Sequence, residues 1–582
     1  MSRIDTWSSK RVRMMHRWHA RRTANVAAAK GFVSSPEPRT VGSYAKGRQF
    51  CAGNIMFAGH LIQAPQTVLW DIASPDPAFV EETQGFGWLD DLAAVGDMSA
   101  RTVAQIWLWD WIRRYGKGHG PGWTPDMAGR RIIRWIHHAL FVLAGQEKAS
   151  SEAFYRSLSH QAAFLQRRWR SALPGLPRFE ALTGLIYAGL SLEGRNALVG
   201  PASEALAREC AAGIDDQGGL VTRNPEELLE VFTLLTWASL ALREAERDVP
   251  EAHQKAIERI APTLRALRHA DGGLARFHGG GRGLNGRLDT ALAEAGVRNQ
   301  IEGLAMGFAR LSAGRSSIIA DAAPPPLGKA SFNGHASTLA FELTSGRRPL
   351  IVNCGSGASF GEDWRRAGRA SPSHSVLAIE GFSSARLGRE QANSGLRREM
   401  LDEGPTEVPV EISAIAEGIR FEGGHNGYVA THGLTHARIL ELSLDGRDLI
   451  GEDLLMTLEE SHKKKFDERM EESRLSGVPY QLRFHLHPDV DAAIDLAGSV
   501  VSMALRSGEV WIFRQDGPTA LSLEASVYLE NGRLRPRATK QIVLSGKAMG
   551  YATRVRWSLA KAKETAIAVR DLARDDYDFD AT

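Results

Sequence analysis

The first half of the chain carries hydrophobic residues at helical spacing. Segments such as VAQIWLWDWIRRY, GRRIIRWIHHALFVLAG and PEELLEVFTLLTWASLALREAE repeat apolar positions every three or four residues, with Gly or Pro between most of them. This pattern predicts successive amphipathic helices over residues 60–315. Each helix has one apolar stripe, so the helices must pack against one another in paired layers.

After Pro324–Pro326 the pattern changes to short runs of period two. STLAFELTSG, ARILELSLDG and KQIVLSG alternate apolar and polar residues, and turn pairs such as Asp-Gly and Asn-Gly recur about every ten residues. Such runs are typical of an antiparallel β-sandwich, which we expect over residues 331–565. The charged segment ESHKKKFDERMEESRLSG interrupts the strands and predicts an exposed loop or short helix.

The predicted fold class is therefore α+β and multidomain, with helices first and a sandwich second. A proline-rich linker over residues 316–330 separates the two domains, because prolines cannot continue a helix. Residues 1–60 form a basic, partly ordered arm, and residues 566–582 an acidic tail that we expect to be disordered.

Composition narrows the class of protein. The chain has 582 residues, 43% hydrophobic and 24% charged, which is typical of a folded globular protein. Its net charge of only +3 argues against a nucleic-acid partner. No apolar run reaches the roughly 20 residues of a transmembrane segment. The three cysteines lie far apart with no CxxC pair, so a disulfide framework and a thiolate zinc site are not expected.

The basic arm has two interpretations. Residues 1–50 contain eleven Lys or Arg against Asp5 and Glu37. The apolar stretch of a secretory signal is missing, because His16, Arg17 and His19 interrupt the candidate core. The arm either binds an anionic lipid or polyanionic glycan, or is a solvated basic helix or frayed tail.

Residues 362–388 contain the first candidate site. His374 opens a predicted strand, and Arg365, Arg366, Arg369 and Arg386 lie around it. Guanidinium groups bind carboxylates or sulfates, and an imidazole can transfer a proton. The alternative is a structural His at the start of a strand, with surface arginines around it.

Residues 423–453 contain the second candidate. His425, His432 and His436 crowd twelve residues beside Tyr428 and Arg438, and could line a carbohydrate cleft or hold a structural divalent metal. Their spacing matches no local zinc pattern. A further pair, in RFHLHPDV, places two imidazoles on one face of a strand, where they could equally be partnered by backbone groups.

Two glycine-containing turns in the helical half form the third candidate. DDQGGLVTRNPEEL supplies Arg223 and Asn224, and HADGGLARFHGGGRG supplies Arg276 and His278. Loops at one rim of the helical domain are where a cleft would form. Asn224 could instead simply cap the helix that begins at Pro225.

Together these strings resemble the heparinase II/III-like family of polysaccharide lyases. The resemblance lies in WRRAGRASPSHSVLAIEG, HNGYVATHGLTHARILELSLDGRDLIGED, RFHLHPDV and SVYLENGRLRPRATKQIVLSG, and more loosely in DDQGGLVTRNP. It implies an incomplete (α/α) toroid followed by the sandwich. It also implies β-elimination: a uronate carboxylate is neutralised, a base removes the C5 proton, and the C4–O4 bond breaks, with no cofactor required.

By position, the resemblance makes His374, Arg223 and Asn224 the catalytic candidates. The sequence departs from the family pattern at two places. Glu227 stands where a catalytic Tyr is expected, and PRFEALTGLIYAGL lacks the Asn-His pair of the family. Tyr428, Tyr187 or His278 could replace the missing base, and Tyr428 completes our catalytic set. Arg365, Arg369, Arg276, His278 and His425 are the expected substrate-binding residues.

Three functions remain open at this point. The first is a lyase acting on an acidic polysaccharide, and the second is a non-catalytic relative that binds acidic glycan or cell-envelope material. The third is a glycoside hydrolase, which needs two carboxylates ~5–10 Å apart; Glu180, Glu227 and Glu230 are its candidates. The resemblance favours the periplasm or envelope, whereas the missing export signal favours the cytoplasm. The sequence indicates no oligomeric state.

Overall fold

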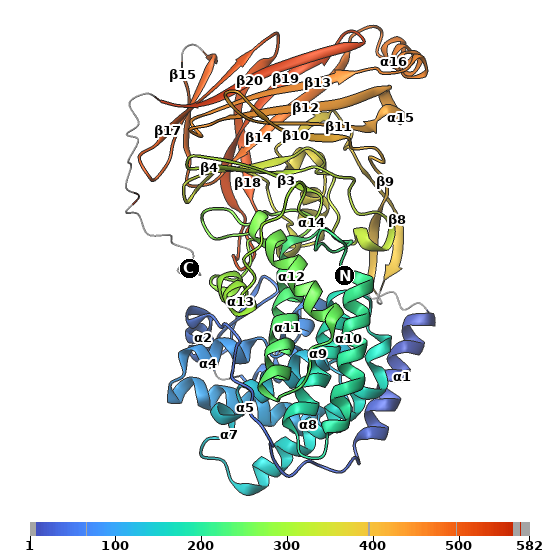
Figure 1. Cartoon of the computed structure of the whole chain (residues 1–582), viewed down its shortest axis with the longest axis vertical. Coiled ribbons are helices and arrows are strands. Elements are labelled where there is room, and N and C mark those ends of the chain that lie inside the picture. Colours follow the sequence, from blue (N-terminus) through green and yellow to red (C-terminus); the bar gives the residue numbers. More distant parts are fainter. Residues whose placement is uncertain (1–6, 66, 394–395, 496–497, 563–570, 572–582) are drawn as a thin grey trace.

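A computed structural model describes residues 7–65, 67–393, 396–495, 498–562 and 571. Most of the helices of the first part gather at one end of the molecule, and most of the strands lie at the other (Figure 1). Helices of the first part are α1 Trp7–Thr23, α2 Tyr44–Cys51, α3 Pro77–Gln84, α4 Trp88–Val95, α5 Met98–Tyr115, α6 Pro125–His137, α7 Ala139–Leu143, α8 Lys148–Arg168, α9 Leu176–Ser191, α10 Val199–Gly213, α11 Pro225–Glu244, α12 Glu251–Ala266 and α13 Arg287–Ala295.

Helix α9 lies at the centre of this helical domain. It is buried along nearly its whole length and contacts α6, α8, α10 and α11. Glycines allow its closest approach, since a Cβ on Gly184 of α9 would lie 2.5 Å from the Cα of Gly129 in α6. The backbones of α6 and α9 can meet only because neither residue has a side chain.

The second part is a sandwich of two antiparallel sheets. One sheet has the order β10-β11-β12-β13-β20-β17-β16-β15 and the other β18-β19-β14-β6-β5-β4-β3, with β7 paired to β14. Their bounds are β3 Phe308–Ala313, β4 Ser316–Asp321, β5 Phe341–Ser345, β6 Arg348–Val352, β7 Leu377–Ile379, β10 Val410–Ile415, β11 Gly418–Tyr428, β12 Leu434–Ser443, β13 Asp448–Met456, β14 Val478–Leu486, β15 Asp491–Asp495, β16 Val500–Ala504, β17 Val510–Asp516, β18 Ala520–Tyr528, β19 Arg537–Ala548 and β20 Ala552–Lys561.

Aromatic rings from the two sheets form the core of the sandwich. Phe484 of β14 packs on Trp557 of β20 with 4.7 Å between ring centroids, and Phe341 of β5 stacks on the same indole at 5.9 Å. These rings are fully or almost fully buried. Their burial holds the sheets face to face, as the period-two pattern predicts.

Smaller elements lie outside the two main layers. They are the hairpin β1 Asn54–Phe57 with β2 His60–Gln63, the hairpin β8 Arg386–Asn393 with β9 Leu396–Glu403, and the helices α14 Glu362–Gly368, α15 Val429–His432 and α16 Glu460–Glu472. Helix α16 corresponds to the charged segment, one of whose two predicted forms was a short helix. The acidic tail lies outside the described residues except for Asp571.

The change from helices to strands occurs before the prolines. Strands β3 and β4 both precede Pro324 and already belong to the second sheet. The segment predicted as the start of a linker therefore forms β4, and all six of its residues are buried. A strand buried on both faces has no polar alternation, which is why the sequence pattern did not reveal it.

Candidate functional site

Arg223 joins the two domains. It lies near the end of the turn 215–224, just before α11, and has a left-handed backbone, with φ +51°. Its five N–H groups have five acceptors: the carbonyl oxygens of Met306, Gly307, Ala323 and Pro324 at 2.8–3.2 Å, and Asp321 Oδ1 at 2.6 Å. A guanidinium has only five N–H donors, so Arg223 has none left for a substrate carboxylate.

A series of buried imidazoles continues from Asp321. His278 Nε2 lies 3.5 Å from Asp321 Oδ2, and His278 Nδ1 accepts a hydrogen bond from the backbone N–H of His335 at 3.1 Å. His335 Nδ1 lies 3.0 Å from His374 Nε2, and His374 Nδ1 lies 2.9 Å from the carbonyl oxygen of Ala370. The series thus runs from the helical domain (His278) into the sandwich (His374).

These contacts fix the proton positions along the series. The Ala370 oxygen can only accept, so His374 carries its proton on Nδ1, and its Nε2 accepts the Nδ1 proton of His335. Burial lowers the pKa of His374 to about 4 and that of His335 well below its ordinary value. Both rings are neutral near pH 7, and the lone pair of His374 is already occupied.

His374 is also closed to solvent. Its exposed fraction is 1%. Asn224 has a structural role as the N-cap of α11. Its Oδ1 accepts hydrogen bonds from the backbone N–H groups of Glu226 and Glu227. The structure therefore brings His374, Arg223 and His278 together, and leaves Asn224 at the adjoining end of the helix.

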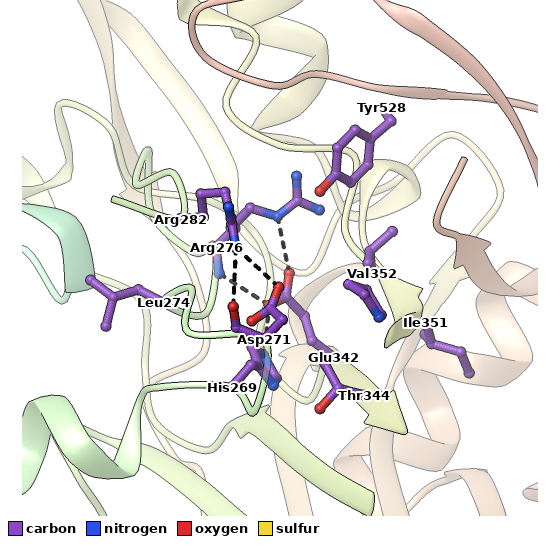
Figure 2. A pocket seen from close by; sticks show the side chains of 11 residues that line it. His269, Asp271, Leu274, Arg276, Arg282, Glu342, Thr344, Ile351, Val352 and Tyr528 are labelled. Atoms are coloured by element: carbon purple, nitrogen blue, oxygen red, sulfur yellow. Dashed lines mark hydrogen bonds and ion pairs between the residues drawn. The ribbon is translucent and has the colours of Figure 1, made fainter. Parts of the chain in front are cut away.

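Arg276 lines a small pocket between the domains (Figure 2). Its guanidinium lies 4.1 Å from the ring centroid of Tyr528 and donates to the Asn353 carbonyl at 2.6 Å, and its Nε lies 3.6 Å from Glu342. Glu342 also contacts His269 at 3.1 Å. The pocket volume is about 20 Å³, which is room for about one water molecule and not for a sugar ring.

A larger groove opens beside α14. Its volume is about 590 Å³, and its lining includes Arg366, Arg369, Arg386, Phe382 and Leu387. Ala370, whose carbonyl oxygen is bonded to His374, lines the same groove. Neither this groove nor the small pocket has His374 itself among its lining residues.

The arginines around the groove differ in whether their guanidinium groups donate to backbone carbonyl oxygens or form ion pairs at the surface. Arg369 donates to the carbonyl oxygens of Gly334, Ser331 and Glu399, and Arg365 to that of Phe332. Arg366 and Arg386 instead pair with Glu399 and Glu403 at the surface. Exposed ion pairs of this kind contribute little to stability and can exchange partners.

The second predicted cluster forms a separate network inside the sandwich. His425 Nε2 lies 3.2 Å from His436 Nδ1, and His436 Nε2 lies 2.8 Å from Asp453. Arg438 donates to the same carboxylate at 2.9 Å, and the buried Tyr428 hydroxyl donates to the Leu377 carbonyl at 3.3 Å. His425 and Tyr428 are thus deeply buried, and burial raises the pKa of Tyr428.

Within the described ranges, no group of three or more His, Cys, Asp or Glu side chains is arranged to hold a metal. The three cysteines are unpaired with one another. No helix in the described part of the chain has the length and apolar character of a membrane span.

The three glutamates considered for hydrolysis each have a partner in the protein. Glu180 contacts Arg130 at 2.6 Å, and burial raises its pKa to about 7. Glu227 accepts from the Thr222 hydroxyl at 2.8 Å, and Glu230 pairs with Arg287. Glu227 occupies the position of the expected Tyr, and burial raises its pKa.

Sequence reasoning missed two members of the interdomain series, Asp321 and His335. Asp321 ends the apolar run SSIIAD, where a single carboxylate after a buried strand would have been the signal. His335 lies in the loop segment NGHAS, which has no periodicity and gives no signal.

The chain thus consists of a helical domain followed by a sandwich of two antiparallel sheets. The sequence model described as "Heparinase II/III-like, C-terminal" matches residues 295–558. The chain belongs to the heparinase II/III-like family.

Among particular proteins, the chain is similar to FtsZ-localized protein C of Caulobacter vibrioides. The two are 32% identical over 505 residues, covering 85% of this chain and 84% of the relative. Two solved structures share the fold. A heparinase III structure has a TM-score of 0.64 and 11% sequence identity, and the match covers 94% of this chain and 89% of that chain. Heparan sulfate lyase HepC from Pedobacter heparinus has a TM-score of 0.52 and 14% sequence identity, and the match covers 94% of this chain and 88% of that chain.

Proposed function

We propose that this protein is a non-catalytic member of its family, which binds a ligand with acidic groups and acts where FtsZ assembles. The proposal that the protein is non-catalytic rests on one observation. The His374 ring has both nitrogens hydrogen-bonded inside the protein, at 2.9 and 3.0 Å, and is closed to solvent. A general base must reach the proton that it removes and must have a free lone pair.

The remaining candidates support the same proposal. Arg223 has no N–H left to neutralise a uronate, and Asn224 caps α11. Without a group that stabilises the developing enolate, removal of a C5 proton has no electrostatic support. The family's Tyr position holds Glu227, a carboxyl that burial keeps less acidic than usual.

The groove beside α14 is the proposed ligand site. Arg366 and Arg386 lie at its surface, and Phe382 and Leu387 add apolar area on which a sugar ring or other compact group can pack. A volume of about 590 Å³ is in the range of ordinary ligand sites. An acidic glycan, the ligand class of the family, fits this combination of charge and apolar surface.

We infer the cellular location from the similarity to FtsZ-localized protein C. FtsZ-localized protein C matches this chain over most of both lengths. We propose that the present protein also localises with FtsZ, which puts it in the same compartment as FtsZ rather than in the periplasm. A fluorescent fusion imaged together with labelled FtsZ tests this directly, and a diffuse signal in cells with normal FtsZ assemblies would contradict it.

The test of the binding function uses heparin, alginate and hyaluronan-type polymers. We expect titration calorimetry to detect binding to at least one of them, and no increase in absorbance from unsaturated uronate. Replacing Arg366 and Arg386 together with Gln should weaken binding at least tenfold. Arg554→Gln is the matched control, because Arg554 is also an exposed sandwich arginine paired with a glutamate.

A lyase is the second candidate, and one observation favours it. His278 of the helical domain lies between Asp321 and His335 of the sandwich, so a change in the domain arrangement would separate His278 from His335, the hydrogen-bond partner of His374. An increase in unsaturated-uronate absorbance that His374→Ala abolishes would establish this alternative and overturn the non-catalytic proposal.

A further inference from the structure

Helix α1 exposes large apolar side chains along one stripe. Trp7, Met14 and Trp18 are 79%, 61% and 48% exposed. Their spacing of seven and four residues places them on the same face of the helix, over about 16 Å. Exposed tryptophans so arranged mark an interaction surface, because isolated folded domains keep such apolar stripes buried.

Basic side chains border this stripe on both sides. At 100° per residue, Lys10, Arg17 and Arg21 lie along one side of it, and Arg11 and Arg22 along the other. The Arg22 guanidinium lies 5.0 Å from the Trp18 ring centroid. The sequence of α1 contains no Asp or Glu. The outer face of α1 is thus an apolar strip between two rows of positive charge.

The opposite face of α1 fixes its orientation. His16, Ala20 and Thr23 are buried, and α1 packs against α8. His160 of α8 donates to the Ala20 carbonyl at 2.6 Å, and Arg168 donates to His16 Nδ1 at 3.2 Å. Helix α1 lies on the outer flank of the helical domain (Figure 1). The charged apolar face therefore points away from the protein without any rearrangement.

We infer that the outer face of α1 is a docking surface for an anionic lipid bilayer. In this arrangement Trp7, Met14 and Trp18 enter the headgroup region, where indole rings are favoured. The flanking Lys and Arg side chains contact the lipid phosphates and carboxylates. An acidic protein or a nucleic acid would use the positive charges but would leave the apolar stripe in water, so the bilayer accounts for more of the observed surface.

Sedimentation of the full chain with vesicles tests the inference. We expect binding to vesicles of phosphatidylglycerol and phosphatidylcholine, weak binding to phosphatidylcholine alone, and a decrease with added salt. Arg17→Gln with Arg21→Gln should lower the partition coefficient at least tenfold, at about fivefold per charge. Trp7→Ser with Trp18→Ser should lower it by a similar factor while keeping the salt dependence.

Matched controls lie elsewhere on the helical domain. Leu140→Ser removes an equally exposed apolar side chain from α7, and Arg208→Gln with Lys255→Gln removes two exposed charges from α10 and α12. These variants should bind vesicles as the parent does. Thermal unfolding checks that each variant is folded. We expect all of them to be folded, because all the changed residues are exposed.

Two results would overturn the inference. The first is absence of binding to the anionic vesicles. The second is binding that the tryptophan variant leaves unchanged and that soluble polyglutamate competes away, which would assign α1 to an acidic macromolecule instead. Neither result bears on the glycan-binding proposal, because the groove beside α14 does not include α1.

Discussion

The imidazole of His374 is held inside the protein by hydrogen bonds at both of its nitrogens. Its Nδ1–H donates to Ala370 and its Nε2 accepts from His335. Removing the ring would leave the Nδ1–H of His335 buried without an acceptor and would take one of two hydrogen bonds from the Ala370 carbonyl oxygen, in addition to a cavity. Such losses each cost about 1–3 kcal/mol.

We therefore predict that His374→Ala lowers the free energy of unfolding by about 2–4 kcal/mol. Urea denaturation followed by circular dichroism measures this, with the exposed His119→Ala as control. Glycan binding should be unchanged in the fraction that is folded. Full stability of the His374 variant would show that the ring is not held as described and would reopen a catalytic role.

At the scale of elements, the crossing of α6 and α9 determines how tightly the helical domain packs. A Cβ on Gly184 would lie 2.5 Å from the Cα of Gly129, and backbone cannot move aside as a side chain can. We predict that Gly184→Ala destabilises the protein by about 1–3 kcal/mol. The matched control is Gly200→Ala in α10, where the added Cβ meets no atom within 4 Å.

That control should be neutral or slightly stabilising, because alanine is the better helix former. Thermal unfolding of the two variants measures the contrast between them. Equal melting temperatures would mean that α6 and α9 do not approach as closely as the structure places them.

The elements also show what the sequence can and cannot predict. Amphipathic helices and alternating strands leave a periodic signal, so the two halves were predictable, and the family resemblance supplied the toroid and sandwich. Strand β4 has no alternation because both of its faces are buried. The internal hydrogen bonds of Arg223 and His374 depend on carbonyl groups of distant residues such as Met306 and Ala370. No local pattern encodes such contacts.

At the scale of the whole molecule, Arg223 couples the two domains. Its replacement by Gln would remove the positive charge beside Asp321, a fully buried carboxylate whose pKa is lowered chiefly by Arg223 against the effect of burial. Breaking a buried ion pair by removing one partner costs about 3–5 kcal/mol. We predict that calorimetry of Arg223→Gln shows two separated unfolding transitions, for the helical domain and the sandwich. A single transition at the parent temperature would contradict this coupling.

Buried neutral histidines make the stability of the whole molecule depend on pH. Burial lowers the pKa of His374, His16 and His253 from 6.5 to about 4. Between these values the unfolded chain binds protons that the folded chain does not, so stability is complete above pH 6.5 and is lost as the pH falls toward 4. We predict a loss of roughly 2 kcal/mol at pH 5 for His374 alone.

Urea midpoints at pH 7.5 and pH 5.0 measure this loss, at constant ionic strength. His374→Gln should reduce the difference between the two midpoints, because it removes one of the titrating groups. A midpoint at pH 5.0 equal to that at pH 7.5 would show that these rings are not held neutral.

The saturated guanidinium of Arg223 also limits what a change at a neighbouring position can achieve. A variant with Tyr at position 227 would still have an arginine whose every N–H is bonded to the protein's own carbonyls and Asp321. Freeing this guanidinium for a bound carboxylate would require the chain around Met306–Pro324 to withdraw as well. A single side-chain replacement beside α11 therefore leaves Arg223 unavailable to any ligand.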